Sequence, residues 1–161
     1  MKEIFGASPE LQAAAFFLRY QVFVLEQNIL PELEFDQLDT VDRQYLVFFD
    51  EQIPIATVRY QKLDESTLNP DRLCVHPDYR NQGLGTKLLA RIESQAFFEG
   101  CQTSVLSAEL SAQAFYEKIG YRVVSDIFEE DGIPCVKCKR TCIGLTDTSS
   151  FNSHFSKVLR V

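Results

Sequence analysis

Two glycines near the middle of the chain stand directly ahead of a segment with helical periodicity, in the loop Arg80-Asn81-Gln82-Gly83-Leu84-Gly85. The first backbone N–H groups of a helix have no partner inside it, and the helix dipole adds partial positive charge there. Glycines lack the Cβ atoms that would keep phosphate oxygens away. The loop therefore predicts an anion site, although a Gly-x-Gly turn before a helix is also common as a purely structural feature.

The two common nucleotide-binding motifs do not fit this loop. The Walker pattern requires a glycine five positions before Gly-Lys-Ser/Thr. In this chain Arg80 stands at the first position, and the later residues are in the wrong order, Gly85-Thr86-Lys87. The dinucleotide fingerprint requires a third glycine at the position of Leu88. It also expects an acidic residue at the end of the next strand, which we predict to end at Ala108. The anion is therefore of another kind.

The cysteines offer two further kinds of chemistry. Cys135, Cys138 and Cys142, together with His154, could suggest a metal site. However, residues 133–140 are expected to form a strand, in which positions three apart point to opposite faces, and structural zinc needs four converging ligands. We therefore predict no metal. Cys74 could suggest a covalent acyl-enzyme, but no His or acidic partner is evident, and we expect it in the core.

The first element expected to position this chemistry is a helix that begins at Ser8-Pro9, with Ser8 as its cap and Pro9 at its first position. Its apolar residues recur every three or four positions, which predicts one buried face: Leu11, Ala15, Leu18, Val22 and Leu25.

The remaining predicted elements alternate between strands and helices. We expect strands at residues 44–50, 53–63, 73–76, 103–108, 121–128 and 133–140. A helix should run from Gly83 to a cap at Gly100, and a short one from Ser111 to Ile119. The order is helix, hairpin, strand, helix, strand, helix, hairpin, which is typical of a mixed α/β domain with one βαβ crossover.

Composition narrows the class of protein. The 161 residues suit one domain, which we place at 1–140, with 141–161 as a packed or partly disordered tail. The net charge of −7 argues against nucleic acid as a partner, because binding it depends on lysines and arginines that neutralise phosphates. No apolar run is long enough to cross a membrane and no signal peptide is evident, so we expect a cytoplasmic protein.

Two stretches resemble one family. Val75 to Gly85 resembles motif A of the GNAT superfamily of acyl-CoA N-acyltransferases, Arg/Gln-x-x-Gly-x-Gly/Ala, and Ala114 to Tyr121 resembles its motif B. Residues 19–27 and 128–134 are similar to the ElaA-like branch. The resemblance covers about residues 8–140. It implies the GNAT fold: a mixed, mostly antiparallel twisted sheet with a central βαβ crossover and helices on both faces.

The resemblance also implies a cosubstrate, acetyl-CoA, with no metal. The strand at 73–75 would splay from the strand near 105–108, and its backbone would bind the pantetheine and polarise the thioester carbonyl. Amides from Gln82 to Thr86 would hold the pyrophosphate, with Arg80 nearby on a phosphate or as a solvated flank. The residues expected to bind the cosubstrate are Leu73, Cys74, Val75, Arg80, Asn81, Gln82, Gly83, Leu84, Gly85, Thr86 and Phe115.

For catalysis, the resemblance places Tyr116 where many family members have the acid that meets the departing thiolate; the alternative is a Tyr116 that only packs against the core. Glu26 and Glu109 are the candidate bases, and each could instead be a helix-end or surface carboxylate. Two positions depart from the branch. Cys135 replaces a common His, and Glu109 replaces a common Gln, so the acceptor could differ here.

The predicted function is therefore transfer of an acetyl group from acetyl-CoA to a primary amine of a small molecule or peptide. An acyl-CoA-binding sensor without turnover is the alternative, and a homoserine-lactone synthase relative is a third reading that the intact glycine loop disfavours. The acceptor is expected along residues 20–40 and 129–140, whose carboxylates would suit a cation. A homodimer is left open.

Overall fold

The computed structural model describes residues 1–145, so the predicted tail beyond residue 145, and His154, which was considered as a metal ligand, lie outside this part. The described chain divides into two compact units. The first unit comprises Met1–Gln61 and Pro70–Ile92, and the second comprises Lys62–Asn69 and the chain from Glu93 onward. Each unit is described by itself.

The strands confirm the predicted mixed, mostly antiparallel sheet, in which β1 pairs β2, β2 pairs β3, and β8 pairs β5, β6 and β7, all antiparallel. β4 and β5 are parallel and are joined through α3 (Leu84–Phe98), which is the predicted βαβ crossover. The strand bounds are β1 Lys2–Gly6, β2 Gln44–Asp50, β3 Ile53–Asp64, β4 Thr67–Val75, β5 Thr103–Glu109, β6 Arg122–Val123, β7 Phe128–Glu130 and β8 Ile133–Thr141.

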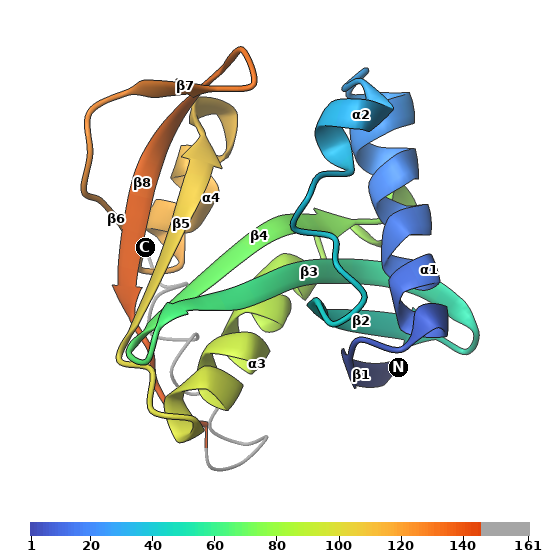
Figure 1. Ribbon diagram of the computed structural model, residues 1–161, viewed down its shortest axis with the longest axis horizontal. Coiled ribbons are helices and arrows are strands. Elements are labelled where there is room, and N and C mark those ends of the chain that lie inside the picture. Colours follow the sequence, from blue (N-terminus) through green and yellow to red (C-terminus); the bar gives the residue numbers. More distant parts are fainter. Residues whose placement is uncertain (146–161) are drawn as a thin grey trace. The chain divides into compact units, whose positions relative to one another are not determined.

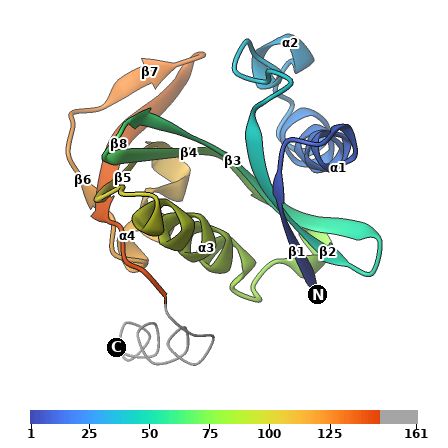
Figure 2. The same ribbon diagram turned by 60° about the horizontal axis from the view of Figure 1, so that its bottom comes forward.

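In the first unit, α1 (Pro9–Arg19) covers one face of β2 (Figures 1 and 2). Ser8 caps it as predicted, because its side chain accepts a hydrogen bond from the N–H of Leu11 at 3.3 Å. The predicted apolar face is buried against Tyr45 and Val47 of β2 at four of its five positions, Leu11, Ala15, Leu18 and Val22.

The fifth position, Leu25, is 64% exposed, so its predicted burial is wrong. The reason is that α1 continues as a π-helix, η1 (Tyr20–Glu26), and Gln27 donates its N–H to the carbonyl of Val22, five residues back. A π-helix advances through a smaller angle per residue than an α-helix, so the 3.6-residue stripe no longer faces the sheet at Leu25.

The opposite face of β2 is covered by the beginning of α3, because the Lys87 ammonium lies 5.3 Å from the ring centre of Phe48, which alternates with Val47 along the strand. Helices therefore lie on both faces of the sheet, as predicted. Within α3, Leu88, Ile92 and Ala96, which recur every four positions, are all buried.

Three features of the fold were not predicted from the sequence. β1 pairs along β2 with Ile4 opposite Val47. A short helix, α2 (Pro31–Glu34), precedes β2 in the chain. β4 begins at Thr67 rather than Leu73, because Asn69-Pro70, which is typical of a turn, is accommodated inside the strand.

In the second unit, β5 pairs with β8 from Thr103–Thr141 to Glu109–Cys135. The predicted strand 121–128 is wrong as a continuous element, because it is divided into β6 and β7. Between them the side chain of Ser125 accepts the N–H of Lys137 at 2.8 Å, and this bond replaces a backbone pair of the ladder. The predicted helix 111–119 is a 3-10 turn, Leu110–Ala112, followed by α4 (Gln113–Lys118).

Candidate functional site

The glycine loop lies in the first unit and follows a 3-10 turn at Pro77–Tyr79. His76 caps that turn, because its Nδ1 accepts the N–H of Asp78 at 3.3 Å. Asn81 and Gly83 have φ angles of 60° and 75°, in the left-handed region. A Cβ at Gly83 would meet nothing within 4 Å, so this glycine is required by the backbone conformation rather than by crowding.

The loop ends in the first turn of α3, where Lys87 donates its N–H to the carbonyl of Gly83 at 3.0 Å. The N–H groups ahead of Lys87, from Leu84 to Thr86, point out of the helix end because an α-helix leaves its first donors without internal partners. This is the arrangement that the sequence predicted for an anion.

The end of β4 precedes the loop. Cys74 is buried in the core of the first unit, and burial raises the pKa of its thiol, which disfavours the thiolate that a nucleophile needs. Leu73 and Val75 flank it and are partly exposed. Arg72, just before them, has a φ of 49°, which marks an irregularity in the strand.

The start of β4 lies in the second unit and pairs with β5 at Thr67–Thr103 and Leu68–Ser104. At the next residue the side-chain amide of Asn69 donates to the carbonyl of Val105 at 2.9 Å. Pro70 follows and has no N–H to donate. The parallel ladder is thus replaced by a side-chain contact after two pairs. The splay of residues 73–75 from residues 105–108 involves both units and stays a prediction.

Arg80 and Glu26 are brought together by the fold, although they are 54 positions apart in the sequence. The guanidinium holds both carboxylate oxygens, Nη1 to Oε1 at 2.7 Å and Nη2 to Oε2 at 2.8 Å. The hydrogen bond from Arg80 lowers the pKa of Glu26. The sequence assigned these residues to phosphate binding and to base catalysis, and nothing in the local pattern indicated that they form an ion pair.

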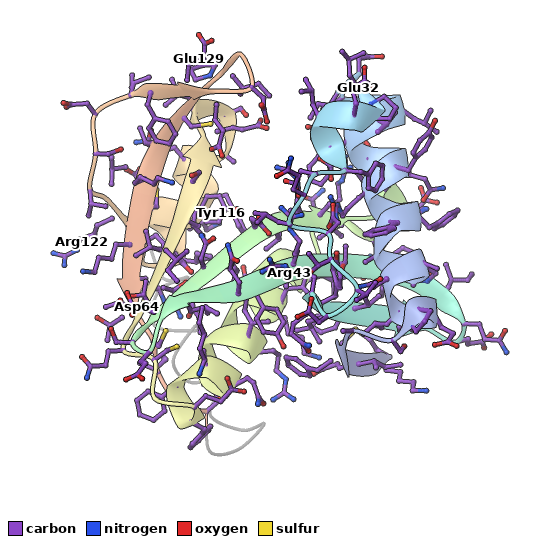
Figure 3. All side chains as sticks on the ribbon, viewed as in Figure 1. Glu32, Arg43, Asp64, Tyr116, Arg122 and Glu129 are labelled. Atoms are coloured by element: carbon purple, nitrogen blue, oxygen red, sulfur yellow. The ribbon has the colours of Figure 1, made fainter. Side chains whose placement is uncertain are left out.

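The other predicted site residues lie in the second unit. Glu109 ends β5, where its Oε2 accepts the hydroxyl of Ser111 at 3.4 Å. Tyr116 lies on α4 and is labelled in Figure 3. Its ring contacts Phe115 with centroids 5.1 Å apart, and it meets the ring of Tyr121 edge-on at 5.7 Å.

Tyr121 belongs to a buried polar network that sequence reasoning missed. Its hydroxyl donates to Oε1 of Glu93 at 2.5 Å, so the hydroxyl of Ser104, 2.7 Å away, donates to Tyr121. Oε2 of Glu93 lies 2.9 Å from Nη2 of Arg140. Burial raises the pKa of Glu93, and Arg140 and Tyr121 only partly offset this. A sequence signal existed, because Glu93 interrupts the apolar stripe of α3.

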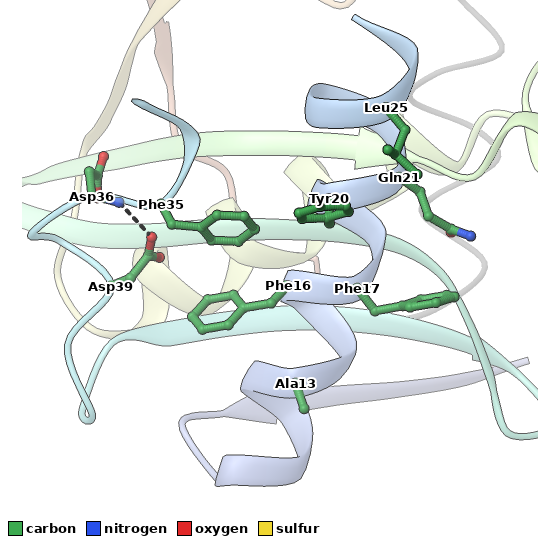
Figure 4. Close-up of a pocket in the computed structure, with 9 residues that line it drawn as sticks. All are labelled: Ala13, Phe16, Phe17, Tyr20, Gln21, Leu25, Phe35, Asp36 and Asp39. Carbon is green, nitrogen blue, oxygen red and sulfur yellow. Dashed lines mark hydrogen bonds between the residues drawn. The ribbon is translucent and has the colours of Figure 1, made fainter. Parts of the chain in front are cut away.

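A groove of about 780 Å³ lies on the outer side of α1 and η1, opposite Phe35 (Figure 4). It is mostly apolar and aromatic, with two carboxylates at one end. Its lining residues are Ala13, Phe16, Phe17, Tyr20, Gln21, Leu25, Phe35, Asp36 and Asp39. It falls within residues 20–40, where the acceptor was expected, and extends onto α1.

The carboxylates of this region are mostly occupied by arginines. In what we call the buried arginine cluster, Arg19 and Arg59 hold the carboxylates of Glu34, Asp36, Asp39 and Asp71. Arg19 lies 2.6 Å from Glu34 and 2.7 Å from Asp39. Arg59 lies 2.6 Å from Asp36 and 2.7 Å from Asp71. The expectation that acids at 20–40 suit a cation therefore needs a carboxylate outside this cluster.

Residues 1–145 lack two features that would mark other classes of protein, a metal-binding cluster and a membrane-spanning helix. No three His, Cys, Asp or Glu side chains in this part of the chain gather in a way that could hold a metal ion. Its five cysteines are free thiols. None of the helices in this part is both long and apolar enough to span a membrane.

Comparison with known proteins identifies the family. The acetyltransferase (GNAT) domain matches residues 41–123. YjcF, an uncharacterized N-acetyltransferase of Bacillus subtilis, is 33% identical over 135 residues, which are 83% of this chain and 95% of YjcF.

Solved structures agree. A candidate N-acetyltransferase from Lactobacillus plantarum superposes with a TM-score of 0.84 and 38% identity, covering 88% of this chain and 98% of that protein. Escherichia coli ElaA gives a TM-score of 0.74 at 25% identity, covering 86% of this chain and 98% of its own. Both the superfamily and the branch resemblance are confirmed. The chain belongs to the GNAT family of acetyltransferases.

Proposed function

We propose that the protein transfers an acetyl group from acetyl-CoA directly to a primary amine of a small molecule or peptide. The observation that carries this proposal is the loop at Arg80–Gly85, whose left-handed Asn81 and Gly83 lead into the exposed N–H groups of α3. Membership of the GNAT family supports the transfer chemistry. The amides of Gln82 to Thr86 would hold the pyrophosphate of the cosubstrate.

In this proposal the nitrogen of the neutral amine attacks the thioester carbonyl carbon. A C–N bond forms, the C–S bond breaks, and the coenzyme leaves as a thiolate. A backbone N–H from Leu73 to Val75 stabilises the developing oxyanion, an effect of about 3 kcal/mol. The irregularity at Arg72 supports this assignment, because it interrupts the regular strand just ahead of those groups.

Two protons must move in this reaction. The amine loses one to a base, for which the candidates are Glu109 at the end of β5 and Glu26, which is paired with Arg80 in this structure. The thiolate receives one, and Tyr116 assists by hydrogen-bonding the forming sulfur anion. A phenol is a weaker acid than a thiol, with pKa values of about 10 and about 8.5, so stabilising the thiolate is the larger part of this role.

The test follows release of coenzyme A thiol from acetyl-CoA across a panel of primary amines, with wild type and Tyr116→Phe. We expect wild type to turn over at least one amine and Tyr116→Phe to lower kcat by 10-fold or more, the usual scale of acid–base assistance. Tyr60→Phe, which removes a phenol hydroxyl from β3, is the matched control and should keep kcat near wild type.

Each outcome separates the competing readings. An unchanged kcat in Tyr116→Phe would exclude the thiolate role for that hydroxyl. Tight binding of coenzyme A without release by any amine would favour an acyl-CoA sensor over an enzyme.

For the acceptor, we propose the groove beside α1 and Phe35. Its aromatic lining suits an apolar body, whereas its two carboxylates, Asp36 and Asp39, are already held by Arg59 and Arg19, so an ammonium group would have to use a carboxylate outside the groove. Amines with a hydrophobic or aromatic body should therefore be the best substrates of the panel. A preference for small hydrophilic amines would argue against this groove.

A further inference from the structure

The Arg80–Glu26 pair has the geometry of an anion complex. The guanidinium binds two oxygens of one group through parallel hydrogen bonds of 2.7 and 2.8 Å. This fork matches carboxylate and phosphate equally well. The third nitrogen, Nε, donates to the carbonyl of Val75 at 3.2 Å and orients the fork. The Glu26 carboxylate thus occupies the face of Arg80 that a phosphate would use.

The pair contributes little to the fold. The side chains of Arg80 and Glu26 are 38% and 42% exposed, and exposed ion pairs are weak because water screens both charges. Arg80 precedes the left-handed Asn81 in an open loop, and Glu26 is the last residue of the π-helix.

A phosphate group is a stronger competitor for Arg80 than the carboxylate is. A diphosphate ester carries more negative charge than Glu26, and the N–H groups at the start of α3 would bind it at the same time. Glu26 can offer Arg80 only its two oxygens. Exchange of partners is therefore favourable once a phosphate ligand reaches the loop.

We propose that Glu26 is an internal competitor for the phosphates of acyl-CoA, and that Arg80 exchanges Glu26 for a phosphate when the cosubstrate binds. This inference rests on the proposed function. The exchange lowers the affinity for coenzyme A by the free energy of the broken pair. It also releases the Glu26 carboxylate, which then lies unpaired beside the loaded loop and is available to a cationic acceptor only after the cosubstrate has bound.

The test is a double-mutant cycle on binding of coenzyme A, measured by isothermal titration calorimetry at fixed ionic strength. Glu26→Gln keeps the shape of the side chain and removes its charge, so we expect Kd to fall about 2- to 5-fold, the range of an exposed ion pair. Arg80→Gln should raise Kd. In the Arg80→Gln background, Glu26→Gln should have almost no further effect, because no exchange remains.

The matched control is Asp78→Asn. Asp78 is two residues from Arg80 and 84% exposed, so its removal changes the local charge equally without touching the pair. Kd should change less than in Glu26→Gln. An equal change in both variants, or a Glu26→Gln effect that persists without Arg80, would reduce the role of Glu26 to general repulsion and overturn the exchange.

The remaining outcomes are also decisive. If Arg80→Gln leaves Kd unchanged, Arg80 does not bind phosphate and the exchange is wrong, whereas the proposed function stands. If the wild type does not bind coenzyme A at all, the proposed function fails first. Thermal unfolding of each variant confirms that the comparison is made on folded protein.

Discussion

The arginines of two charged regions in the first unit differ in burial and in the number of carboxylates that they bind. In the buried arginine cluster, Arg19 and Arg59 are 0% and 2% exposed, and each holds at least two carboxylates. At the glycine loop, Arg80 is 38% exposed and holds one. A buried charge must keep its partners, because losing one leaves an uncompensated charge in a medium of low polarity, whereas an exposed charge can exchange them.

The two regions therefore differ in what they do for the molecule. The buried arginine cluster ties α2 and residues 36–39 to α1 and to the sheet, and so fixes the wall beside the groove. The loop contributes little to stability, and its N–H groups and the Arg80 guanidinium stay available to a ligand. Four predictions test this division, and they run from the largest expected effect to the smallest.

Removing a buried arginine should have the largest effect. Arg19→Met leaves Glu34 and Asp39 without the cation that lies 2.6 and 2.7 Å from them. We expect the free energy of unfolding to fall by about 3–5 kcal/mol, the usual consequence of breaking a buried pair on one side. Urea denaturation measures it.

Two comparisons sharpen this result. Arg80→Met should lower the free energy of unfolding by less than about 1 kcal/mol. The double variant Arg19→Met with Glu34→Leu should recover part of the loss, because it removes one of the orphaned charges. Equal losses in Arg19→Met and Arg80→Met would show that burial does not distinguish the two regions.

The loop should respond to a change of backbone preference rather than of charge. Gly83→Val places a β-branched residue at a φ of 75°, with a cost to folding of about 1–2 kcal/mol. In open surroundings the loop would relax away from the left-handed conformation, and Kd for coenzyme A should rise 10-fold or more. Calorimetry and urea denaturation separate the two effects.

The matched control is Gly100→Val. Gly100 ends α3 with a φ of 99°, and its nearest non-neighbour atom to an added Cβ is 4.0 Å away. It should lose similar stability and keep its affinity for coenzyme A. If Gly83→Val folds and binds coenzyme A like the wild type, the loop is not the cradle.

The same contrast explains what could be predicted from the sequence. The loop is a local feature: its glycines, its helix and the motif that contains Arg80 lie within a few residues, and the structure has them in the predicted arrangement. The partners in the buried arginine cluster are 12 to 23 positions apart, and no periodicity connects Arg19 with Glu34 or Arg59 with Asp36. Arg19 did interrupt an apolar stripe, which signals a buried charge but not its partner.

Errors in the predicted elements have the same origin. The strand 121–128 has a suitable composition, yet the hydrogen bond from Lys137 to the side chain of Ser125 divides it. Leu25 fits the helical stripe, yet the π-helix turns it outward. In both cases the apolar pattern in the sequence was real, but the hydrogen bonds that the backbone forms gave a different local structure.

Acid should weaken the buried arginine cluster more than it weakens the loop. Burial by itself would raise the pKa of Asp39, but hydrogen bonds from Arg19 and Tyr45 outweigh it and hold this pKa below its ordinary value. A lowered folded-state pKa stabilises the fold fully above the unfolded-state pKa of about 3.9, and this stabilisation is lost progressively as the pH falls from that value to the folded-state pKa.

Between pH 5 and pH 3, we expect the wild type to lose about 1 kcal/mol more than Asp39→Asn, which has no carboxylate to protonate at that position. The free energy of unfolding measured in urea at each pH gives the comparison, and Asp78→Asn serves as an exposed reference that should follow the wild type. Parallel pH profiles for wild type and Asp39→Asn would contradict the assignment.

The smallest effect on stability should come from Glu26→Gln. Its pair with Arg80 is exposed, so the free energy of unfolding should stay within about 0.5 kcal/mol of the wild type, while Kd for coenzyme A falls. An altered Kd with an unchanged free energy of unfolding distinguishes the loop from the buried arginine cluster, because loss of a charge in that cluster must lower the free energy of unfolding. A stability loss above about 1 kcal/mol in Glu26→Gln would place the Arg80–Glu26 pair with the structural charges, and the exchangeable role of Arg80 would then have to be abandoned.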